Sequence, residues 1–377
     1  MVNAQRATFS AENILPGHPD RVCDAIAESI VAYACSDDPE ALVGVEVALH
    51  RSLVVVTGRV AGTVHAGSGG EWPVKLDQET LERIVSDAFT FAGYTDRWTH
   101  PVNIISDLDV GDLSMEERAI RRFSDDQTIV TGFADPQGPL MLPVEAYAAR
   151  RIKDALTIAR GAHRDILGPD GKVLVTFSNT GGRPVLTAVN ISIQHRAGVE
   201  YGDLHDMVLP AVLAAIQDIG PWADLDLCGD WFRLNGIGDF TCGGPMGDNG
   251  LSGKKLVVDF YGPQIPIGGG AICGKDVHKP DRVGALRARQ VARRLAVVTG
   301  QPTHVEMGWL PGLESPDRLS ARLKDGRRLS RNEIEHEIAL PDLTLAGSAR
   351  ELELASVPWP QVMQDGYFGA PERSWER

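Results

Sequence analysis

Three consecutive glycines, Gly268 to Gly270, begin the segment that most constrains this chain. Glycine has no side chain, so the backbone there can approach a ligand or a neighbouring strand closely. Lys275 and Lys279 follow four residues apart, and Asp281 comes two residues later. Ammonium groups suit phosphate oxygens, and a carboxylate suits the metal ion that accompanies them. We therefore expect this segment to form a loop that binds a polyphosphate.

The surroundings of this loop argue against a P-loop. Residues 269–275 fit the pattern G-x-x-x-x-G-K, but Asp276 follows where binding of Mg²⁺ needs Ser or Thr. We predict a strand at 256–261 that leads into the loop and a helix over 281–299 that leaves it, later than a P-loop helix begins. The arginines of this helix are expected on an outer face that meets solvent or another subunit: Arg287, Arg289, Arg293 and Arg294.

The chain is acidic, which limits its partners. Its 377 residues carry 37 Lys and Arg against 51 Asp and Glu, a formal charge of −14. Such a protein binds nucleic acid and anionic membranes poorly, so we expect neither as a partner. An anionic substrate needs a local basic site, and four lysines can supply it: Lys254, Lys255, Lys275 and Lys279.

The cysteines and the hydropathy indicate a cytoplasmic protein. Five cysteines, an odd number with no C-x-x-C pair, are typical of reduced thiols. No apolar run approaches the ~18 residues of a membrane span, and we expect no signal peptide at the start. The length suits two or three domains.

Helix and strand patterns alternate along the chain, with hairpins among them. Apolar, β-branched runs at 41–49 and 52–60 predict a hairpin. Pro19 and the apolar spacing after it predict a helix that begins beside His18 and Asp20. We further predict helices over 77–89, 143–159 and 203–219, strands at 102–106, 172–178 and 185–195, a glycine-rich loop at 61–73, a turn at 179–182, a mobile polar lid at 107–125, and a tail docked through Trp359, Phe368 and Trp375. This order favours an α+β fold over a doubly wound sheet.

Three candidate residues are ambiguous when taken alone. His18 and Asp20 lie at a predicted helix start, where anions and metal-bound phosphates bind well. An acid there can also simply complement the helix dipole. Glu46 interrupts an apolar strand, so it either faces solvent or serves as a ligand.

Four motifs agree on one family. They are G-H-P-D at 17–20, P-D-x-K at 169–172, G-G-P-M-G-D-x-G-L-[ST]-G-x-K at 243–255 and G-G-G-A-x-x-G-K-D-x-x-K-x-D-R at 268–282. With these motifs the chain resembles the S-adenosylmethionine synthetases (methionine adenosyltransferases) over nearly its whole length. The resemblance implies three similar sheet-plus-helix domains in an α+β fold with pseudo-threefold symmetry. We assign them to residues 1–106, 115–233 and 234–377, and expect the true structural domains to be discontinuous.

The same resemblance implies a reaction and an assembly. The sulfur of L-methionine attacks C5′ of ATP and expels the triphosphate, which the same site hydrolyses to phosphate and diphosphate. Mg²⁺ is implied as a cofactor, and K⁺ as a helper. A homodimer or tetramer with active sites shared between subunits is also implied.

Residue roles follow from the resemblance, position by position. Catalytic positions match His18, Lys172 and Lys275. Positions around the nucleotide and its phosphates match Asp170, Phe240, Lys254, Lys255, Ala271 and Lys275, and positions near the ribose and methionine match Asp248 and Lys279. The Mg²⁺ ligands match Asp20 and Asp281, and the carboxylate associated with K⁺ matches Glu46.

The departures from the family concentrate in the half of the site that holds methionine. Arg59 stands where the family has a glutamate that receives the methionine amino group, and 107–125 lacks the family's Q-S-P-D-I. Asp125-Asp126-Gln127-Thr128 replaces G-D-Q-G, and Y-A-I-G-V-A-E-P appears only as Glu306-Met307-Gly308-Trp309-Leu310-Pro311. An arginine opposite an ammonium gives repulsion where a glutamate gives attraction.

Several interpretations stay open on this basis. The chain either forms S-adenosylmethionine with a relocated amino-group partner, for example Asp107, Asp109 or Asp112, or adenosylates a different nucleophile. A catalytically weak, ATP-binding regulatory subunit is a further alternative, and the retained motif residues argue against it. A phosphotransferase would form ADP, whereas adenosyl transfer forms phosphate and diphosphate without ADP.

Overall fold

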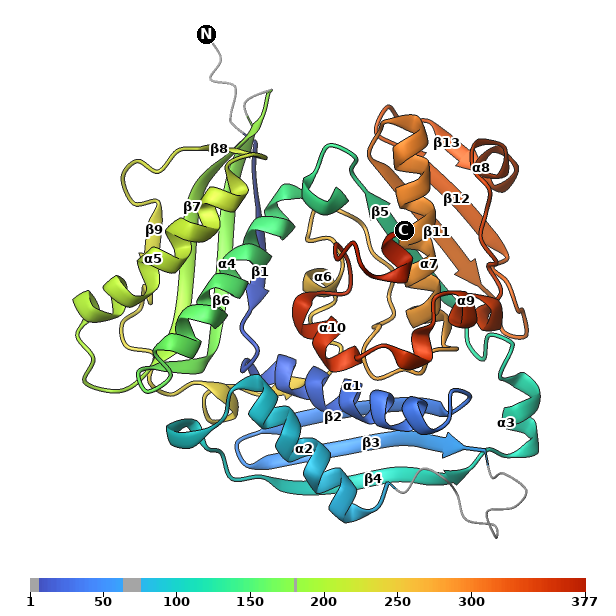
Figure 1. The fold of residues 1–377 in the computed structure, drawn as a ribbon, viewed down its shortest axis with the longest axis horizontal. Coiled ribbons are helices and arrows are strands. Elements are labelled where there is room, and N and C mark those ends of the chain that lie inside the picture. Colours follow the sequence, from blue (N-terminus) through green and yellow to red (C-terminus); the bar gives the residue numbers. More distant parts are fainter. Residues whose placement is uncertain (1–6, 64–75, 180–181) are drawn as a thin grey trace.

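The computed structural model describes residues 7–63, 76–179 and 182–377, in which three β-sheets surround a central group of helices (Figure 1). Sheet A contains β1 (Ala7–Ile14), β6 (Leu167–Asn179), β7 (Pro184–His195) and β8 (Asp224–Leu225) in that order, with β9 (Phe232–Leu234) also on β7. Sheet B has the order β10 (Gly250–Leu251), β2 (Leu42–His50), β3 (Leu53–Gly62), β4 (Asn103–Asp112). Sheet C has the order β13 (Arg328–Ser330), β12 (Arg318–Leu323), β11 (Thr303–Trp309), β5 (Thr128–Ala134). The predicted loop at 61–73 and turn at 179–182 lie partly outside the described residues.

Helices cover one face of each sheet, as Figure 1 shows. Sheet A is covered by α4 (Val144–Ala162) and α5 (Tyr201–Ile219), sheet B by α1 (Pro19–Asp37) and α2 (Gln78–Ala92), and sheet C by α7 (Pro280–Thr299). The shorter helices are α3 (Met115–Ile120), α6 (Leu256–Asp259), α8 (Arg331–Glu337), α9 (Leu345–Glu351) and α10 (Trp359–Asp365), with 3₁₀ turns at Asp96–Trp98, Pro139–Met141, Gly244–Met246, Leu354–Ser356 and Ser374–Glu376. The predicted helices and the hairpin are confirmed, with boundaries shifted by a few residues.

The sheets join segments that are far apart in the sequence. β1 pairs with β6, β5 pairs with β11, and β10 pairs with β2, all antiparallel. Each sheet therefore combines strands from more than one of the sequence ranges 1–106, 115–233 and 234–377. Those ranges stay a proposal for the division of the chain.

The predicted strand at 256–261 is wrong. Residues 256–259 form the short helix α6, and Phe260 and Tyr261 continue into the core. The Asp259 carboxylate lies 2.7 Å from Arg21 Nη1, and the Tyr261 ring stacks 4.9 Å from that of Phe368. Since an apolar run of this length fits either a buried strand or a helical turn, tertiary contacts decided its conformation.

The predicted outer arginine face of α7 is also wrong for its central residues. Arg287 and Arg289 are buried, and the Arg289 guanidinium lies 2.9 Å from Glu376 Oε2. Arg287 pairs with Glu351. The C-terminal segment thus folds over α7 and neutralises arginines that sequence alone placed at the surface.

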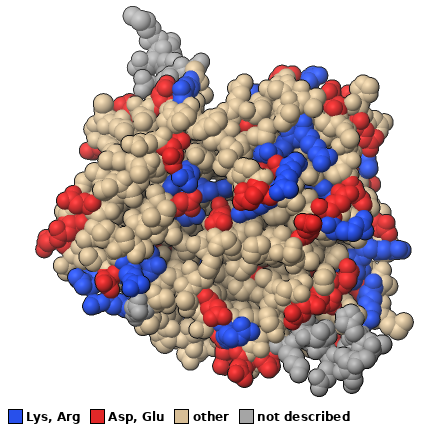
Figure 2. Space-filling view, viewed as in Figure 1, with Lys and Arg blue, Asp and Glu red and all other residues tan. Residues whose placement is uncertain are grey.

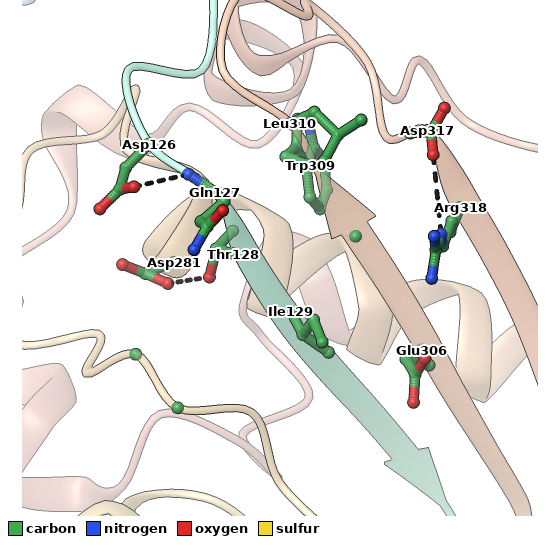
Figure 3. Close-up of a pocket in the computed structure, with 13 residues that line it drawn as sticks. Asp126, Gln127, Thr128, Ile129, Asp281, Glu306, Trp309, Leu310, Asp317 and Arg318 are labelled. Atoms are coloured by element: carbon green, nitrogen blue, oxygen red, sulfur yellow. Dashed lines mark hydrogen bonds and ion pairs between the residues drawn. The ribbon is translucent and has the colours of Figure 1, made fainter.

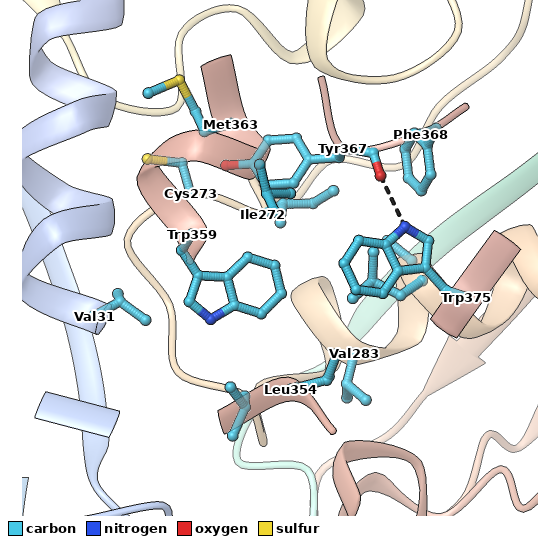
Figure 4. Packing of buried hydrophobic residues seen from close by; sticks show 14 of the residues in the cluster. Val31, Ile272, Cys273, Val283, Leu354, Trp359, Met363, Tyr367, Phe368 and Trp375 are labelled. Carbon is cyan, nitrogen blue, oxygen red and sulfur yellow. Dashed lines mark hydrogen bonds between the residues drawn. The ribbon is translucent and has the colours of Figure 1, made fainter. Parts of the chain in front are cut away.

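The aromatic tail docks as predicted (Figure 4). Trp359, Phe368 and Trp375 are buried, and the indoles of Trp359 and Trp375 stack with centroids 6.1 Å apart. The Trp375 Nε1–H donates to the Tyr367 carbonyl at 2.8 Å. The tail therefore completes the hydrophobic core that sheets B and C share.

Surface charge and hydropathy bear on the expected partners. Basic and acidic side chains are interspersed over the face drawn in Figure 2, without an extended basic surface. In the described residues, no helix combines the length and the apolar character that crossing a bilayer requires. All five cysteines are free thiols.

Glu145 gives a pH-dependent stability that can be measured. It is buried in the first turn of α4, and burial raises the pKa of its carboxyl to about 7 from 4.5. Between these pH values the folded chain keeps the proton that the unfolded chain has lost, so stability falls as pH rises through this window. Relative to Glu145→Gln, the native chain should lose roughly 3 kcal/mol of unfolding free energy across it. Denaturant titrations of both proteins at several pH values test this, and parallel pH profiles would contradict it.

Candidate active site

The turn that carries His18 and Asp20 is pressed against β6. The Gly17 N–H donates to the Pro169 carbonyl at 3.1 Å, and a Cβ on Gly17 would lie 2.3 Å from Pro169 Cβ. The Tyr94 hydroxyl donates to the Gly17 carbonyl at 2.6 Å. Only glycine fits this approach. The contact places the start of α1 beside the P-D-x-K segment at the start of β6.

His18 is a neutral hydrogen-bond donor at the N-cap of α1. Its Nδ1 accepts the Asp20 backbone N–H at 3.2 Å. Burial lowers the pKa of the imidazole to about 4, against the attraction of Asp20. With Nδ1 acting as acceptor, the proton of the neutral ring lies on Nε2. The ring can therefore donate to an anion near pH 7 without carrying a charge.

Asp20 is the centre of a charged cluster. Its carboxylate is fully buried and accepts from Lys255 Nζ at 2.6 Å and from the Leu251 N–H at 3.0 Å. Lys254 Nζ lies 3.5 Å from Oδ1 of Asp20, the oxygen that accepts from Leu251. Burial opposes ionisation, but the Lys255 and Leu251 hydrogen bonds hold the pKa of Asp20 below its usual value. The 243–255 motif thus delivers two ammonium groups to the helix start.

The remaining residues of this group lie on β6 and the 236–253 loop. Asp170 is buried and accepts the Gly244 N–H at 2.7 Å, and burial raises the pKa of its carboxyl to about 6. Lys172 is half-exposed, with Nζ 3.7 Å from Glu12 Oε2. Both Lys172 and Asp248 act electrostatically on His18. We call His18, Asp20, Asp170, Lys172, Asp248, Lys254 and Lys255 the α1 group.

Phe240 is held through its backbone. His195 N–H donates to the Phe240 carbonyl at 3.0 Å, and the Phe240 N–H donates to His195 Nε2 at 3.1 Å. The Phe240 backbone, which follows β9 in the chain, is therefore fixed beside the end of β7. These two hydrogen bonds do not connect Phe240 to the lysines of the α1 group.

Lys275, Lys279 and Asp281 form a second group, the loop group, at the start of α7. Lys275 Nζ pairs with Asp281, which also accepts from the Thr128 hydroxyl. Lys279 Nζ pairs with Asp125. As in the α1 group, lysines that can hold phosphates are paired with aspartates. An anion with its own counter-ion can displace such pairs.

Glycine is required at two points of this loop. A Cβ on Gly268 would lie 1.9 Å from the Ile129 carbonyl oxygen, and one on Gly270 would lie 2.0 Å from Asp281 Oδ1. The loop is thus clamped against β5 and the first turn of α7. This is the close backbone approach expected from the sequence, and the partners in the structure are β5 and Asp281.

The two groups are separate within the chain. Among the described residues, no hydrogen bond or ion pair joins a side chain of the α1 group to one of the loop group. Gly253, beside Lys254, approaches the glycine loop, because a Cβ on Gly253 would lie 2.8 Å from the Ala271 Cβ. Glu46 is exposed on β2, and among the described residues it has no hydrogen bond or ion pair to either group.

A cavity of about 550 Å³ opens next to the loop group (Figure 3). Gln127, Thr128 and Asp281 line one side, and Trp309 and Leu310 lie at one end. Glu306 and Arg318 line the opposite side, across Ile129 and Gly308. The sequence predicted Asp281 here but assigned no role to Glu306, Arg318 or Trp309. The sequence feature that could have indicated Glu306 and Trp309 was the departure of residues 306–311 from the family's Y-A-I-G-V-A-E-P segment.

The carboxylates fit Mg²⁺ but form no preassembled cage. In the described part of the chain, no group of three or more His, Cys, Asp or Glu side chains is arranged for a metal ion. Mg²⁺ is commonly held by one or two carboxylates while water and substrate phosphates complete its shell. Asp20 and Asp281 each present one carboxylate beside phosphate-binding lysines, which suits that mode. Glu46 brings no such set, so its link to K⁺ stays a prediction.

Arg59 is engaged by the segment that was predicted to be a lid. Its Nε and Nη2 donate to the Glu117 carboxylate at 3.0 and 3.1 Å, and Nη2 donates to the Asp112 carbonyl at 2.8 Å. The Arg59 hydrogen bonds lower the pKa of Glu117 to about 2. The prediction of a lid loop is wrong for residues 107–112, which extend β4 alongside β3. Arg59 therefore ties α3 to sheet B.

A second arginine, which sequence reasoning missed, anchors the other end of α3. Arg121 Nη2 lies 3.0 Å from the buried Asp276 carboxylate, which also accepts the Val43 N–H at 2.8 Å. Asp276 is the residue that excluded a P-loop. Its role here is to connect the glycine loop with β2 and α3.

Comparison with known proteins identifies the family. The chain matches the S-adenosylmethionine synthetase N-terminal domain over residues 6–104, the central domain over 122–226 and the C-terminal domain over 242–377. An S-adenosylmethionine synthase of Parvibaculum lavamentivorans is 30% identical over 98% of this chain and 95% of its own length. The chain belongs to the S-adenosylmethionine synthetase family.

Other members support the same placement. An S-adenosylmethionine synthase of Corynebacterium jeikeium is 32% identical over 98% of this chain and 94% of its own. A solved structure described as an unusual S-adenosylmethionine synthetase from Campylobacter jejuni matches with a TM-score of 0.85 at 24% identity, covering 98% of this chain and 97% of that one. This likeness confirms the predicted three-domain α+β fold. As a member of the S-adenosylmethionine synthetase family, the chain is a methionine adenosyltransferase-like enzyme.

Proposed function

We propose that this enzyme transfers the adenosyl group of ATP to the sulfur of L-methionine and releases phosphate and diphosphate. The observation that carries the proposal is the α1 group, in which buried His18 and Asp20 meet Lys254 and Lys255 at a helix N-terminus. Such a site stabilises negative charge as it develops on a departing triphosphate. Family membership supports the same reaction.

The chemistry assigns a task to each side chain. A sulfur lone pair forms the bond to C5′, and the C5′–O bond breaks with its electron pair passing to the triphosphate. The Nε2–H of His18 donates to that oxygen, while Lys172, Lys255 and Lys275 hold phosphate oxygens. Mg²⁺ would be held by Asp20 and Asp281 and would offset the charge of the phosphates. Water then hydrolyses the triphosphate held by the same lysines.

The separation of the α1 group from the loop group supports an assembled site. Each group alone offers lysines and aspartates, and neither encloses a triphosphate. We propose that a homodimer or tetramer brings the α1 group of one subunit to the loop group of another. A cytoplasmic location and a role for K⁺ at Glu46 belong to this proposal.

A different nucleophile is the second candidate function, and Arg59 is the observation that favours it. Arg59 would repel an ammonium held where the family places it. However, its guanidinium is occupied by Glu117 and backbone carbonyls, so it does not offer a free cation to an acidic acceptor either. This engagement favours methionine with a relocated amino-group partner.

Product analysis distinguishes these functions. With ATP, L-methionine and Mg²⁺, mass spectrometry should detect an adenosyl sulfonium, and phosphate and diphosphate should appear without ADP. A panel of thioethers and thiols in place of methionine tests the second candidate. ADP as the nucleoside product would assign a phosphotransferase instead and overturn the proposal.

A further inference from the structure

Glu306 is a carboxylate without a partner in the cavity beside the loop group. It is exposed on β11, and within the described residues its side chain makes no hydrogen bond or ion pair. Arg318 lines the same cavity, and His304, Arg322 and Arg328 line an adjoining one with Glu306. Among the described residues none of these four forms an ion pair with Glu306, so its carboxylate is suited to receive the cation of a ligand.

Arg318 lies on the same side of the cavity, on the neighbouring strand β12. It pairs in register with Gly308, whereas Glu306 pairs with Ser320, so the two charged residues are diagonal neighbours. Within the part of the chain that the structure describes, the only ion pair of Arg318 is with its neighbour Asp317, at 3.7 Å, and 83% of the Arg318 side chain is exposed. Figure 3 shows both charged groups at the edge of the hollow opposite Asp281. One anion receptor and one cation receptor thus flank the same space.

The floor between these charges and the glycine loop is apolar and open. Gly308 has no side chain, and its cross-strand neighbour Ile129 is 54% exposed. The Ile129 carbonyl is in turn covered by Gly268 at the start of the glycine loop. One row of β11, from Glu306 to Gly308, spans about 7 Å. That span suits the side chain of a linear amino acid lying across the hollow.

We propose that Glu306 and Arg318 clamp the zwitterionic head of an α-amino acid acceptor, with Glu306 receiving the ammonium and Arg318 the carboxylate. The thioether chain lies over Ile129 and Gly308 and points toward the glycine loop. This inference rests on the proposed adenosyl transfer and specifies its acceptor site. The amino-group partner has moved from the position of Arg59 on sheet B to Glu306 on sheet C.

The experiment compares substrates that lack one charge of the head group. Wild type and Glu306→Gln are assayed with L-methionine and with its desamino analogue, methylthiobutanoate. Neutralising Glu306 should lower kcat/KM for methionine roughly tenfold or more, chiefly through KM, and leave the desamino analogue within about twofold. In the same way, Arg318→Gln should penalise methionine but not methioninol, which lacks the carboxylate.

Two further variants control for indirect effects. Asp317→Asn removes a carboxylate from the same cavity and should leave the ratio of methionine to desamino activity unchanged. Gly308→Ala narrows the hollow, and its Cβ would make only ordinary contacts, with Arg318 Cβ at 3.7 Å and the Thr128 carbonyl oxygen at 3.8 Å, so it should fold yet weaken both substrates.

The outcomes separate this inference from the proposed function. Equal losses for methionine and its desamino analogue in Glu306→Gln, or no loss, would overturn the clamp while leaving adenosyl transfer in place. If wild type forms no sulfonium, the proposed function fails. Calorimetric titration of methionine into the enzyme with a non-hydrolysable ATP analogue then decides the clamp, because wild type should bind methionine roughly tenfold or more tightly than Glu306→Gln, and equal affinities would overturn it.

Discussion

Lys275→Ala should lower kcat by about 100-fold or more, equivalent to ~3 kcal/mol of transition-state stabilisation. Lys275 is fixed by the clamped glycine loop and pairs with Asp281, so its ammonium is positioned before the substrate arrives. A preorganised cation of this kind acts mainly on the charge that develops as the triphosphate leaves. Steady-state rates with saturating ATP and methionine measure the effect.

A matched lysine controls for charge alone. Lys324 is exposed and belongs to neither the α1 group nor the loop group. Lys324→Ala should therefore leave kcat within about twofold. Circular dichroism and melting of both variants confirm that folding is retained. Near-normal turnover in folded Lys275→Ala would remove the phosphate role assigned to the loop group.

Glu376→Gln should destabilise the chain by about 3 kcal/mol or more. The Glu376 carboxylate is buried and meets Arg289 at 2.9 Å and Arg293 at 3.0 Å, and it also accepts the Gly369 N–H at 2.8 Å. Removing its charge leaves the fully buried Arg289 guanidinium without a counter-ion. Denaturant unfolding measures the loss.

Glu372 provides the comparison for this second variant. It lies in the same tail but is exposed, so Glu372→Gln should change stability by no more than about 0.5 kcal/mol. Equal free energies of unfolding for the two variants would show that Glu376 does not stabilise the chain by neutralising Arg289 and Arg293 of α7.

The parts of the site that sequence predicted are those in which chemistry and backbone both restrict the residue type. Gly268 and Gly270 admit no side chain because Ile129 and Asp281 occupy the space. Asp20 and Lys255 meet in a buried pair that few other residues could form. Because several such positions follow one another along the chain, they form long sequence motifs, and these motifs were sufficient to assign the family and the fold.

The parts that sequence missed depend on partners distant along the chain. Arg289 looked like a surface residue because Glu376 lies 87 positions later. Arg59 looked like a repulsive departure because Glu117, which neutralises it, lies 58 positions away. Residues 256–259 are helical, and Asp259 at the end of this helix pairs with Arg21, which lies far away in the sequence. Pairings of this kind are set by tertiary structure, and no local spacing encodes them.

The most direct test of adenosyl transfer follows the oxygen that bridges C5′ and the α-phosphorus of ATP. With a heavy-oxygen label at that position, L-methionine and Mg²⁺, attack at C5′ should place the whole label in the released phosphate and diphosphate and none in the nucleoside product. Label that stays with the nucleoside would show cleavage at phosphorus and would contradict adenosyl transfer.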